Sequence, residues 1–343
     1  SMLADSSGRI VARAPRFDEA VVIVDTDVPS VSEAETDLQV LDVSEPRQRD
    51  DNRVAATVAV LDPLAELYQA LVTATGDYVR KSGFTDVGLG LSGGIDSALV
   101  AAVAADALGS DHVHAVLMPS RYSSDHSVVD AEELAVNLRI DTLTVPIESA
   151  HTVLGDQLAS SISSPLSGVA DENLQARIRG VMLMSLANTF GWLVLATGNK
   201  SEAAVGYSTL YGDTVGAYAP IKDVYKTVVY ELVRWRNERD GAPVVPVSIL
   251  EKAPSAELRP NQRDDDSLPR YEVLDPLLET YIEGDRTRVE LVRDGFDADL
   301  VEEVVRLVDQ AEFKRRQNPP GVRVTQKGFG RDRRLPLVNR YRG

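Results

Sequence analysis

The chain has 343 residues, 43% of them hydrophobic, and a formal net charge of −17. This length suits one large or two modest domains, and the acidic balance argues against a nucleic-acid partner. The chain contains no cysteine, which excludes disulfides and thiolate metal sites within it and favours a reducing cytoplasm. No apolar run reaches the roughly 18 residues of a membrane span, so we expect a cytoplasmic protein with no membrane partner.

The pattern of the first 60 residues indicates the end of a larger N-terminal domain followed by a linker. Residues 9–28 hold two apolar runs on either side of a turn, which predicts two short strands. Residues 29–53 are acidic and poor in aromatic residues, as is typical of a linker. A hairpin and a linker cannot form their own core. We therefore assign 1–28 to the remnant of an N-terminal domain, 29–60 to a linker and 61–343 to the main domain.

Strands and helices alternate from Leu61 onwards. Leu64, Leu67 and Leu71 recur at helical spacing. The later predictions are strands 87–91, 113–118, 142–147 and 192–197 and helices 96–108, 127–138, 171–190 and 223–239, with an irregular stretch at 148–170. This alternation predicts an α/β fold, with a doubly wound, mostly parallel sheet covered by helices on both faces. Loops at the carboxyl ends of the strands should converge on one ligand site.

Two segments are candidate mobile loops. Residues 120–127 follow the second predicted strand, and residues 251–272 form a long, polar stretch rich in proline. A loop of that length in a compact domain is usually a lid or a linker. Its position after the second half of the sheet favours a lid.

Residues 90–97 read Gly-Leu-Ser-Gly-Gly-Ile-Asp-Ser and join a predicted strand to a predicted helix. Such a turn directs backbone N–H groups and a helix N-terminus at one point, which suits a phosphate. Gly93 and Gly94 allow positive φ and close approach of the backbone to an anion. Asp96 would repel phosphates unless it held a divalent cation that bridges to them. The alternative is an ordinary strand–turn–helix that binds no ligand. Such a turn needs glycines but has no need of Ser92, Asp96 and Ser97.

This loop differs from the Walker pattern because it contains no lysine. It resembles the loop of the ATP pyrophosphatases, which split ATP between the α and β phosphates and transfer AMP to a substrate oxygen. A second carboxylate, Glu202, begins a helical turn just past the strand predicted at 192–197. It could be a second ligand of the cation held by Asp96. The alternative is a first-turn acid placed by the helix dipole, and the glycine loop favours the ligand.

The C-terminal 31 residues carry ten Lys or Arg and one acid, Asp332. Such a tail is either a solvated or nucleic-acid-binding arm, or it folds back and offers cations to an anionic ligand. Apolar residues among the charges, such as Phe329 and Leu337, favour a tail packed on the body.

From Leu61 to Gly343 the chain resembles the ammonia-activating synthetase domain of NAD⁺ synthetases. The resemblance is carried by residues 90–97, 173–179, 197–213, 252–258 and 313–316. Residues 9–28 resemble the final strands of the nitrilase-type glutaminase domain that precedes it in the glutamine-dependent enzymes. The rest of that domain, with its cysteine nucleophile, is absent here. The chain therefore looks like the synthetase part of a bifunctional enzyme.

The resemblance implies ATP-dependent amidation of deamido-NAD⁺ to NAD⁺. The substrate carboxylate would be adenylated and then attacked by ammonia, with release of AMP and pyrophosphate. Glutamine would supply the ammonia only in the full-length enzyme. ATP and Mg²⁺ are the implied co-substrate and cofactor. Helix 171–190 resembles the family's homodimer interface, although a buried core helix is the alternative, and a larger homo-oligomer is expected at full length.

The resemblance also assigns roles to single residues. ATP would bind Gly90, Leu91, Ser92, Gly93, Gly94, Ile95, Asp96, Ser97, Thr197, Lys226 and Ser255, with Lys252 and Ser255 in the lid. Deamido-NAD⁺ would bind Asn173, Arg177, Glu202, Tyr207, Asp213 and Lys314. Asp96 and Glu202 would hold Mg²⁺, and Asp96, Asp213 and Lys226 would be catalytic. The mechanism itself, rather than the resemblance, leads to the hypothesis that Asp213 takes up a proton from ammonia. Ammonia-only members carry a histidine before the basic pair near the C-terminus, where this chain has Phe313.

Two other functions stay open from the sequence. The first is another ATP pyrophosphatase, such as a GMP synthetase or a tRNA-modifying ligase, because the glycine loop is common to all of them. Residues 197–213 and the loop that begins at Lys252 argue against these. The second is a nucleotide-binding module without catalysis, which would need neither Glu202 nor a lid.

Overall fold

The computed structural model describes residues 1–24 and 57–338. The chain forms two compact units, Ser1–Asp62 and Pro63–Gly343. The domain boundary that we predicted after residue 60 lies close to this division, whereas most of the predicted linker 29–60 lies outside the described residues. None of the helices in the described part of the chain is long and apolar enough to cross a bilayer.

The first unit contains one antiparallel hairpin. Strands β1 (Met2–Ala4) and β2 (Ile10–Arg13) pair with Leu3 opposite Ala12. Residues 14–24 form no strand, so the second strand predicted within 9–28 is wrong for its described part, and β1 was missed. The apolar residues Val21 and Ile23 suggested a strand, but both are exposed and have no core to pack against.

The second unit is built on a four-stranded parallel sheet. Its strands are β3 (Val87–Gly90), β4 (Val113–Leu117), β5 (Asp141–Thr144) and β6 (Leu193–Val194), in the order β5-β4-β3-β6. The helices that follow the strands cover both faces of the sheet, which confirms the predicted α/β fold. All four strands are shorter than predicted, and β5 begins one residue earlier. In particular, β6 ends at Val194, after which Leu195 pairs with Tyr218 as an isolated bridge.

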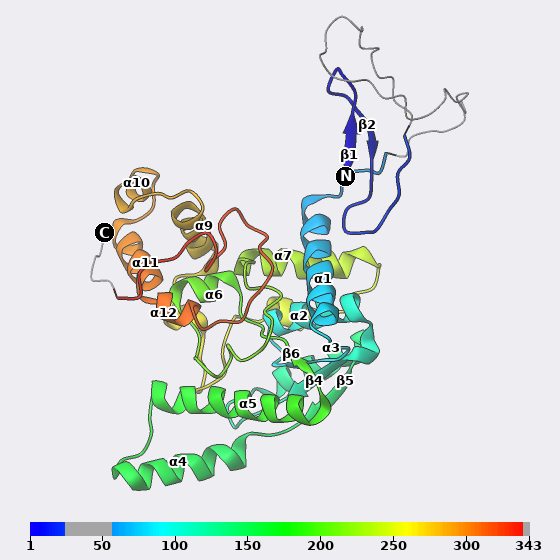
Figure 1. The fold of residues 1–343 in the computed structure, drawn as a ribbon. Coiled ribbons are helices and arrows are strands. Elements are labelled where there is room, and N and C mark those ends of the chain that lie inside the picture. The colour runs from blue at the N-terminus through cyan, green and yellow to red at the C-terminus, as the bar shows by residue number, and fades with distance from the viewer. Residues whose placement is uncertain (25–56, 339–343) are drawn as a thin grey trace, which may run out of the picture. The chain divides into compact units, whose positions relative to one another are not determined.

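Helices cover the sheet unevenly (Figure 1). On one face lie α1 (Pro63–Lys81), α2 (Ile95–Leu108), α3 (Asp125–Leu138) and α7 (Lys226–Arg239), and α5 (Val169–Phe190) covers the other. The first group shares one apolar core, in which every α2 residue from Ala98 to Ala104 is buried. On the opposite face Leu183 and Ala187 of α5 pack against Val116 and Val194 of the sheet.

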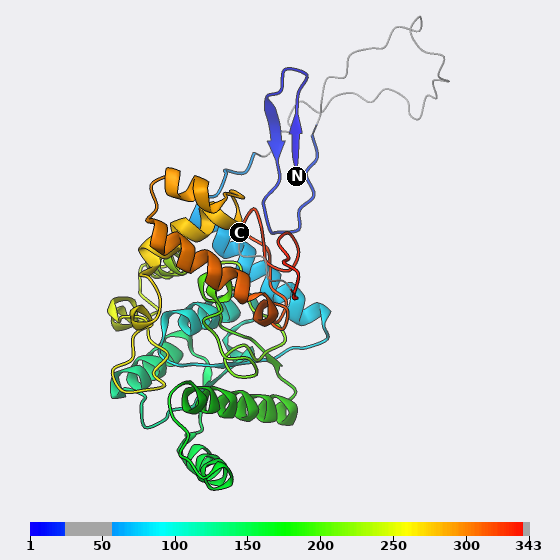
Figure 2. The ribbon, with the colours of Figure 1, turned by 90° about the vertical axis from the view of Figure 1, so that its left-hand side faces the viewer.

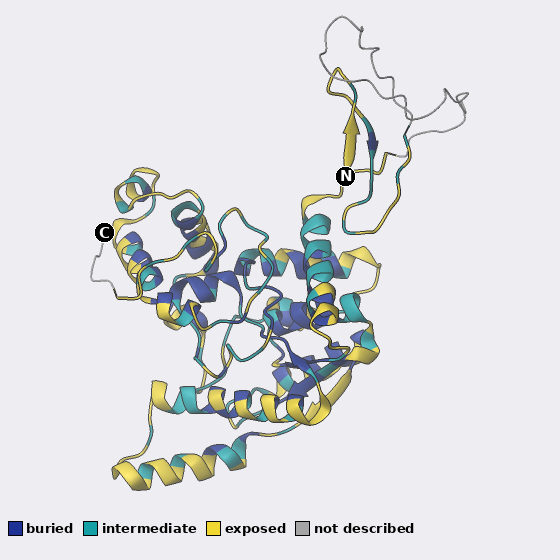
Figure 3. Cartoon of the chain, viewed as in Figure 1, coloured by how far each residue is buried: buried dark blue, intermediate teal, exposed yellow. Residues whose placement is uncertain are grey.

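Residues 148–170, predicted as irregular, contain helix α4 (Glu148–Ile162). The prediction was wrong because the helix has no buried stripe to reveal its period. His151 is its only buried residue, and Val153, Leu158 and Ile162 are exposed. Figure 3 shows that exposed residues cover much of α4 and the outer side of α5.

The helix predicted from residue 223 begins at Lys226, with Tyr225 as an extended N-cap. Asp223 is not in the helix because its carboxylate is used elsewhere. It accepts hydrogen bonds from the backbone N–H groups of Val324 and Thr325, each at 2.9 Å. The start of α7 is therefore set by contacts with a segment a hundred residues away in the sequence.

A second layer of helices follows the sheet, of which only the helical turn at Glu202 was predicted. It contains α6 (Lys200–Val205), α9 (Tyr271–Ile282), α10 (Arg288–Arg293), α11 (Ala298–Gln310) and α12 (Glu312–Arg315). Helix α8 (Val247–Glu251) instead packs against α3 and α7 and contributes Ile249 to the first core. Figures 1 and 2 show α9 to α12 gathered in one group beside α6. Their apolar side chains form a core of their own, to which α6 contributes Ala204 and Val205.

The described part of the basic tail packs on the body, as predicted. The Lys314 Nζ donates to the carbonyl oxygens of Gly206 and Ser208, each at 2.7 Å. Arg315 is buried, and its guanidinium donates to the Ala204 carbonyl oxygen at 2.7 Å. The tail therefore braces α6 and the loop that follows it.

Candidate active site

A pocket of about 320 Å³ lies at the carboxyl ends of the strands. Its walls come from the loop after β3, from Pro119 after β4 and from Thr197 after β6. The predicted convergence of these loops is therefore confirmed. Residues 252–258 and the start of α7 complete the lining.

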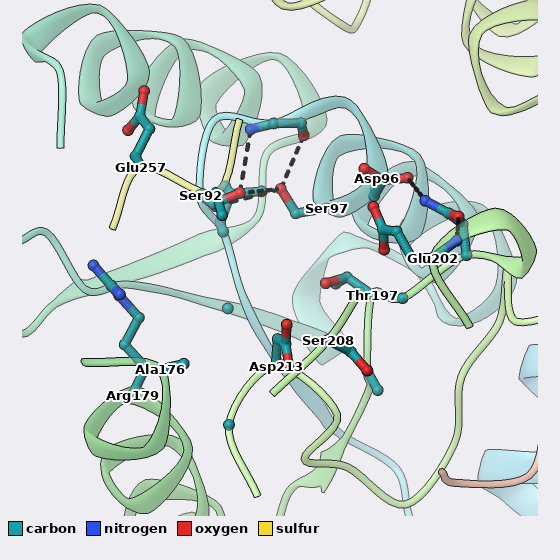
Figure 4. A pocket seen from close by; sticks show the side chains of 18 of the residues that line it. Ser92, Asp96, Ser97, Ala176, Arg179, Thr197, Glu202, Ser208, Asp213 and Glu257 are labelled. Carbon is teal, nitrogen blue, oxygen red and sulfur yellow. Dashed lines mark hydrogen bonds between the residues drawn. The ribbon is translucent and has the colours of Figure 1, made fainter. Parts of the chain in front are cut away.

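The glycine loop is organised by two serines before any ligand binds (Figure 4). Ser92 Oγ lies 3.1 Å from Ser97 Oγ and accepts a hydrogen bond from the Gly94 N–H at 3.2 Å. Ser97 Oγ in turn donates to the Gly94 carbonyl oxygen at 3.0 Å. Gly93 has a φ of +75°, and a Cβ there would lie 2.2 Å from the Ser127 carbonyl oxygen. Gly93 does not line the pocket. Its lack of a side chain allows the turn to pack closely against the Ser127 carbonyl of α3.

Asp96 and Glu202 meet at the ammonium group of Lys226. The Lys226 Nζ hydrogen-bonds to Asp96 Oδ2 and lies 3.4 Å from Glu202 Oε1. Asn199, which caps α6, donates to Asp96 Oδ1 at 2.8 Å. Two carboxylates from separate loops and one lysine thus form a single charged group beside the glycine loop.

Burial shapes the protonation of this group. It raises the pKa of Glu202 to about 8; the nearby Lys226 opposes this shift and Asp96 adds to it. Burial alone would lower the pKa of Lys226, but the charges of Asp96 and Glu202 outweigh it, and the pKa is raised. Lys226 therefore stays charged and in turn favours ionised carboxylates around it.

The carboxylates of Asp96 and Glu202 fit a magnesium ion. They supply hard oxygen donors that converge on one cation, and Mg²⁺ in nucleotide sites is usually held by one or two carboxylates plus phosphate oxygens. Among the described residues no cluster of three or more His, Cys, Asp or Glu side chains could hold a metal by itself. The remaining ligands would therefore have to come from a nucleotide and water.

Asp213 also lines the pocket and lies across it from the serines of the glycine loop (Figure 4). Its Oδ1 accepts the Thr209 N–H at 2.7 Å. Although the side chain is open to the water of the pocket, the protein atoms around it desolvate the carboxylate and raise its pKa to about 6, against the Thr209 hydrogen bond and the charge of Lys314. A carboxyl with this pKa can accept a proton near neutral pH.

The segment predicted as a lid covers one side of the pocket. Lys252 bonds to Glu257 Oε1 at 2.7 Å and also contacts Ser127 Oγ. Glu257 accepts from Ser127 Oγ at 2.6 Å. These bonds hold the segment against the start of α3, and Ser255 lines the pocket between them.

The structure brings most of the predicted site residues to this pocket. Those that line it are Gly90, Leu91, Ser92, Gly94, Ile95, Asp96, Ser97, Thr197, Glu202, Tyr207, Asp213, Lys226 and Ser255. The roles assigned to them remain predictions.

Three predicted substrate residues lie behind the pocket wall. Asn173 Oδ1 accepts from Thr209 Oγ1 at 2.7 Å, and Arg177 Nε donates to the Leu210 carbonyl oxygen at 3.2 Å. With Lys314, which bonds to Gly206 and Ser208, they hold the loop that carries Tyr207 and Asp213. In this structure they position the pocket wall, and direct contact with a substrate remains a prediction.

Sequence reasoning gave no role to four charged residues of the lining, Arg179, Lys222, Glu257 and Asp264. Arg179 Nε donates to the Met118 carbonyl oxygen at 2.9 Å, and burial lowers the pKa of this arginine to about 10. Its position two residues after Arg177, on the same helix, was the available sequence signal. Asp264 is the first of three consecutive aspartates and the only buried one. Nothing in the run distinguishes it.

Comparison with known proteins decides the family. The family model for NAD synthase matches residues 67–318. The chain belongs to the NAD synthase family. It is 52% identical over 285 residues to the glutamine-dependent NAD⁺ synthetase of Acinetobacter baylyi, covering 82% of this chain and 52% of that protein. The corresponding protein of Rhodobacter capsulatus is 45% identical over 351 residues, covering 100% of this chain and 60% of that protein.

Solved structures of similar proteins support the same family. A glutamine-dependent NAD⁺ synthetase from Acinetobacter baumannii in complex with ADP is 47% identical with a TM-score of 0.57, over 84% of this chain and 52% of that one. An NMN synthetase from Francisella tularensis is 29% identical with a TM-score of 0.62, over 74% and 96%. The chain spans just over half the length of the glutamine-dependent relatives described here.

Proposed function

We propose that this chain catalyses the ATP-dependent amidation of deamido-NAD⁺ to NAD⁺. The observation that carries the proposal is the group formed by Asp96, Lys226 and Glu202 beside a glycine loop at the N-terminus of α2. A phosphate-binding turn flanked by two carboxylates suits a nucleoside triphosphate with its cation. The names of the relatives support NAD⁺ as the product.

In the first step ATP binds with its phosphates at the turn from Ser92 to Ser97, where backbone N–H groups and two hydroxyls offer hydrogen bonds. Asp96 and Glu202 would hold Mg²⁺, and this ion would supply positive charge against the departing pyrophosphate. The carboxylate oxygen of the nicotinate attacks the α-phosphorus, and pyrophosphate leaves. Lys226 stabilises the negative charge on the phosphates during this step.

In the second step ammonia attacks the acyl carbon of the adenylated carboxylate, and AMP leaves. The attacking nitrogen must lose a proton, and Asp213, with its raised pKa, accepts it. The chain contains no cysteine, so it has no thiol with which to hydrolyse glutamine. We therefore propose that this chain uses free ammonia, and that glutamine serves only together with a glutaminase domain of the kind that the relatives' names imply.

We also propose a homodimer through α4 and the outer side of α5. Apolar side chains on both helices are exposed, among them Leu158 and Ile162 of α4 and Val181 and Phe190 of α5. Exposed apolar patches of this kind usually mark an interaction site.

Pyrophosphate release tests the function. The assay contains ATP, Mg²⁺ and ammonium with one of four acceptors: deamido-NAD⁺, nicotinic acid mononucleotide, xanthosine monophosphate or none. The mononucleotide is included because one structural neighbour is an NMN synthetase. We expect release only with deamido-NAD⁺, accompanied by NAD⁺. Release with another acceptor would reassign the substrate, and ATP binding without release from any acceptor would favour a nucleotide-binding module.

A further inference from the structure

The segment over the pocket carries a carboxylate that the proposed mechanism does not use. Asp264 is 5% exposed and belongs to the pocket lining. Its Oδ2 accepts the Tyr271 hydroxyl at 3.0 Å, and its backbone N–H donates to the Pro254 carbonyl oxygen at 3.0 Å. Among the described residues its Oδ1 is buried and has no hydrogen-bond partner, although the Tyr207 hydroxyl lies close enough to the carboxyl group to lower its pKa. A buried carboxylate oxygen without a donor is costly, so a donor from a bound ligand would stabilise it.

The surroundings of Asp264 favour a small cation as that donor. Asp96, Glu202 and Asp264 lie close enough to influence one another electrostatically, with Lys226 as the cation among them. Burial raises the pKa of Glu202 and of Asp264, so a second cation bound near them would favour their ionised forms. The Lys226 Nζ also lies 5.4 Å from the ring centroid of Tyr271, so the buried ring next to Asp264 already faces one nitrogen cation.

The size of the donor is limited as well. Because Oδ1 is shielded from solvent, neighbouring side chains must shift before any donor reaches it, and a donor the size of a water molecule needs a much smaller shift than a ribose or a base. Ammonium is the one small cationic donor among the substrates of the proposed reaction.

We propose that Asp264 captures ammonium, the nitrogen substrate, in this pocket. This inference rests on the proposed function. Ammonium donates an N–H to Oδ1 and is held beside Tyr271. It then gives one proton to water in the pocket, and the neutral ammonia that remains attacks the acyl carbon and loses its second proton to Asp213. Asp264 binds the substrate, and the later proton acceptor remains Asp213. The lid segment thus contributes a substrate-binding residue in addition to Ser255.

The test is the substitution Asp264→Asn, which keeps the shape and the acceptor for Tyr271 but removes the charge. With ATP and deamido-NAD⁺ saturating, we expect the KM for ammonium to rise about 10- to 100-fold, the range for loss of a hydrogen bond to a charged group. The KM values for ATP and deamido-NAD⁺ should stay unchanged. Hydroxylamine, a nucleophile that is uncharged at neutral pH, should be used by the variant as well as by the wild type.

Asp265→Asn is the matched control. Asp265 is the neighbouring residue, is exposed and pairs with Arg263 at 2.8 Å, so its loss should leave every KM unchanged. An unchanged KM for ammonium in Asp264→Asn would overturn the inference. A raised KM for ATP or deamido-NAD⁺ instead would also overturn it, because Oδ1 would then serve the nucleotide.

A second measurement needs no variant and covers the case in which Asp264→Asn does not fold. Potassium has nearly the size of ammonium and should compete with ammonium but not with hydroxylamine in the wild-type chain. Inhibition that is the same with both nucleophiles would contradict a cation site. Failure of the wild type to form NAD⁺ from ammonium would overturn the proposed function itself, whereas an active wild type with no such discrimination would overturn only the role of Asp264.

Discussion

Lys226 illustrates how a single side chain can hold two acidic residues in place at one site. Its ammonium group takes the place between Asp96 and Glu202 where a cation is needed, so the two carboxylates do not repel each other when no ligand is bound. Asn199 adds a neutral hydrogen bond to Asp96. When a nucleotide and its cation bind, Lys226 can turn toward the phosphates with little rearrangement of the backbone. Such preorganisation is the usual source of electrostatic catalysis.

The pH dependence of the reaction should report on Asp213, whose pKa is raised to about 6. Below that pH the carboxyl is protonated and cannot accept a proton from the attacking nitrogen. We expect kcat/KM, expressed per neutral ammonia, to fall about tenfold per pH unit below 6. The substitution Asp213→Asn should lower the rate about 100-fold and abolish this acid limb. Steady-state rates of the wild type and of Asp213→Asn between pH 5 and 8 measure this pH dependence.

Stability provides the control for this variant. A folded-state pKa above the ordinary value of 3.8 means that ionisation of Asp213 disfavours the folded state. This cost is absent below pH 3.8 and complete above about pH 6. Asparagine removes the cost and can still accept the Thr209 N–H, so at pH 7 Asp213→Asn should not lower the melting temperature. An acid limb that persists in the variant would assign the titration to another group.

At the scale of elements, the glycine loop was predictable because its chemistry is local. Strand, turn and helix lie within residues 87–108, and the turn residues dictate the backbone. Helix α4 was not predictable in the same way, since its apolar residues face outward and give no buried period. The start of α7 was misplaced because Asp223 bonds to Val324 and Thr325, a contact that no local pattern shows.

Gly93 offers a test of the loop with a matched control on the same helix. Gly93 and Gly109, at the two ends of α2, both have positive φ, +75° and +90°. Alanine at either should cost about 1–3 kcal/mol, because both backbones have a positive φ that residues other than glycine rarely adopt. Only at Gly93 would the new Cβ meet the Ser127 carbonyl, at 2.2 Å. We expect Gly93→Ala to lose ATP binding in calorimetry, and Gly109→Ala to keep it. Equal ATP affinity in the two variants would show that the loop tolerates the overlap.

Lys200 connects α6 to the C-terminal segment. Its fully buried Nζ lies 3.1 Å from Asp223 and 3.0 Å from Glu283, and it donates to Thr325 Oγ1 at 2.6 Å. The substitution Lys200→Met leaves two buried carboxylates without their cation and should destabilise the fold by about 3–5 kcal/mol. Lys81→Met removes an exposed helix pair with Asp77 and should cost about 0.5 kcal/mol or less. Urea unfolding measures both, and similar losses would mean that the buried contacts of Lys200 contribute little.

At the scale of the whole molecule, the pocket depends on segments that no local pattern could bring together. Asp96 and Lys226 are 130 residues apart, and Lys314 lies more than a hundred residues beyond the loop that it holds. The parallel sheet predicted that strand ends converge, which placed Asp96 and Thr197. Asp264 and Arg179 came to light only in the folded chain, because burial depends on the helical layer packed beside the sheet.

The homodimer that we propose should be sensitive to charge on α5 and insensitive to it elsewhere. Val181 on α5 is 66% exposed, and Val289 on α10 is similarly exposed at 61%. Glutamate at an exposed helix position costs the monomer little, but at position 181 it would place a charge in the apolar interface. We expect Val181→Glu to sediment as a monomer at concentrations where the wild type and Val289→Glu are dimers. A wild type that sediments as a monomer, or a dimer that survives Val181→Glu, would exclude this face.

Because α5 also carries Arg179 and Ala176 on the pocket side, loss of the dimer should loosen the pocket wall and raise the KM for substrate.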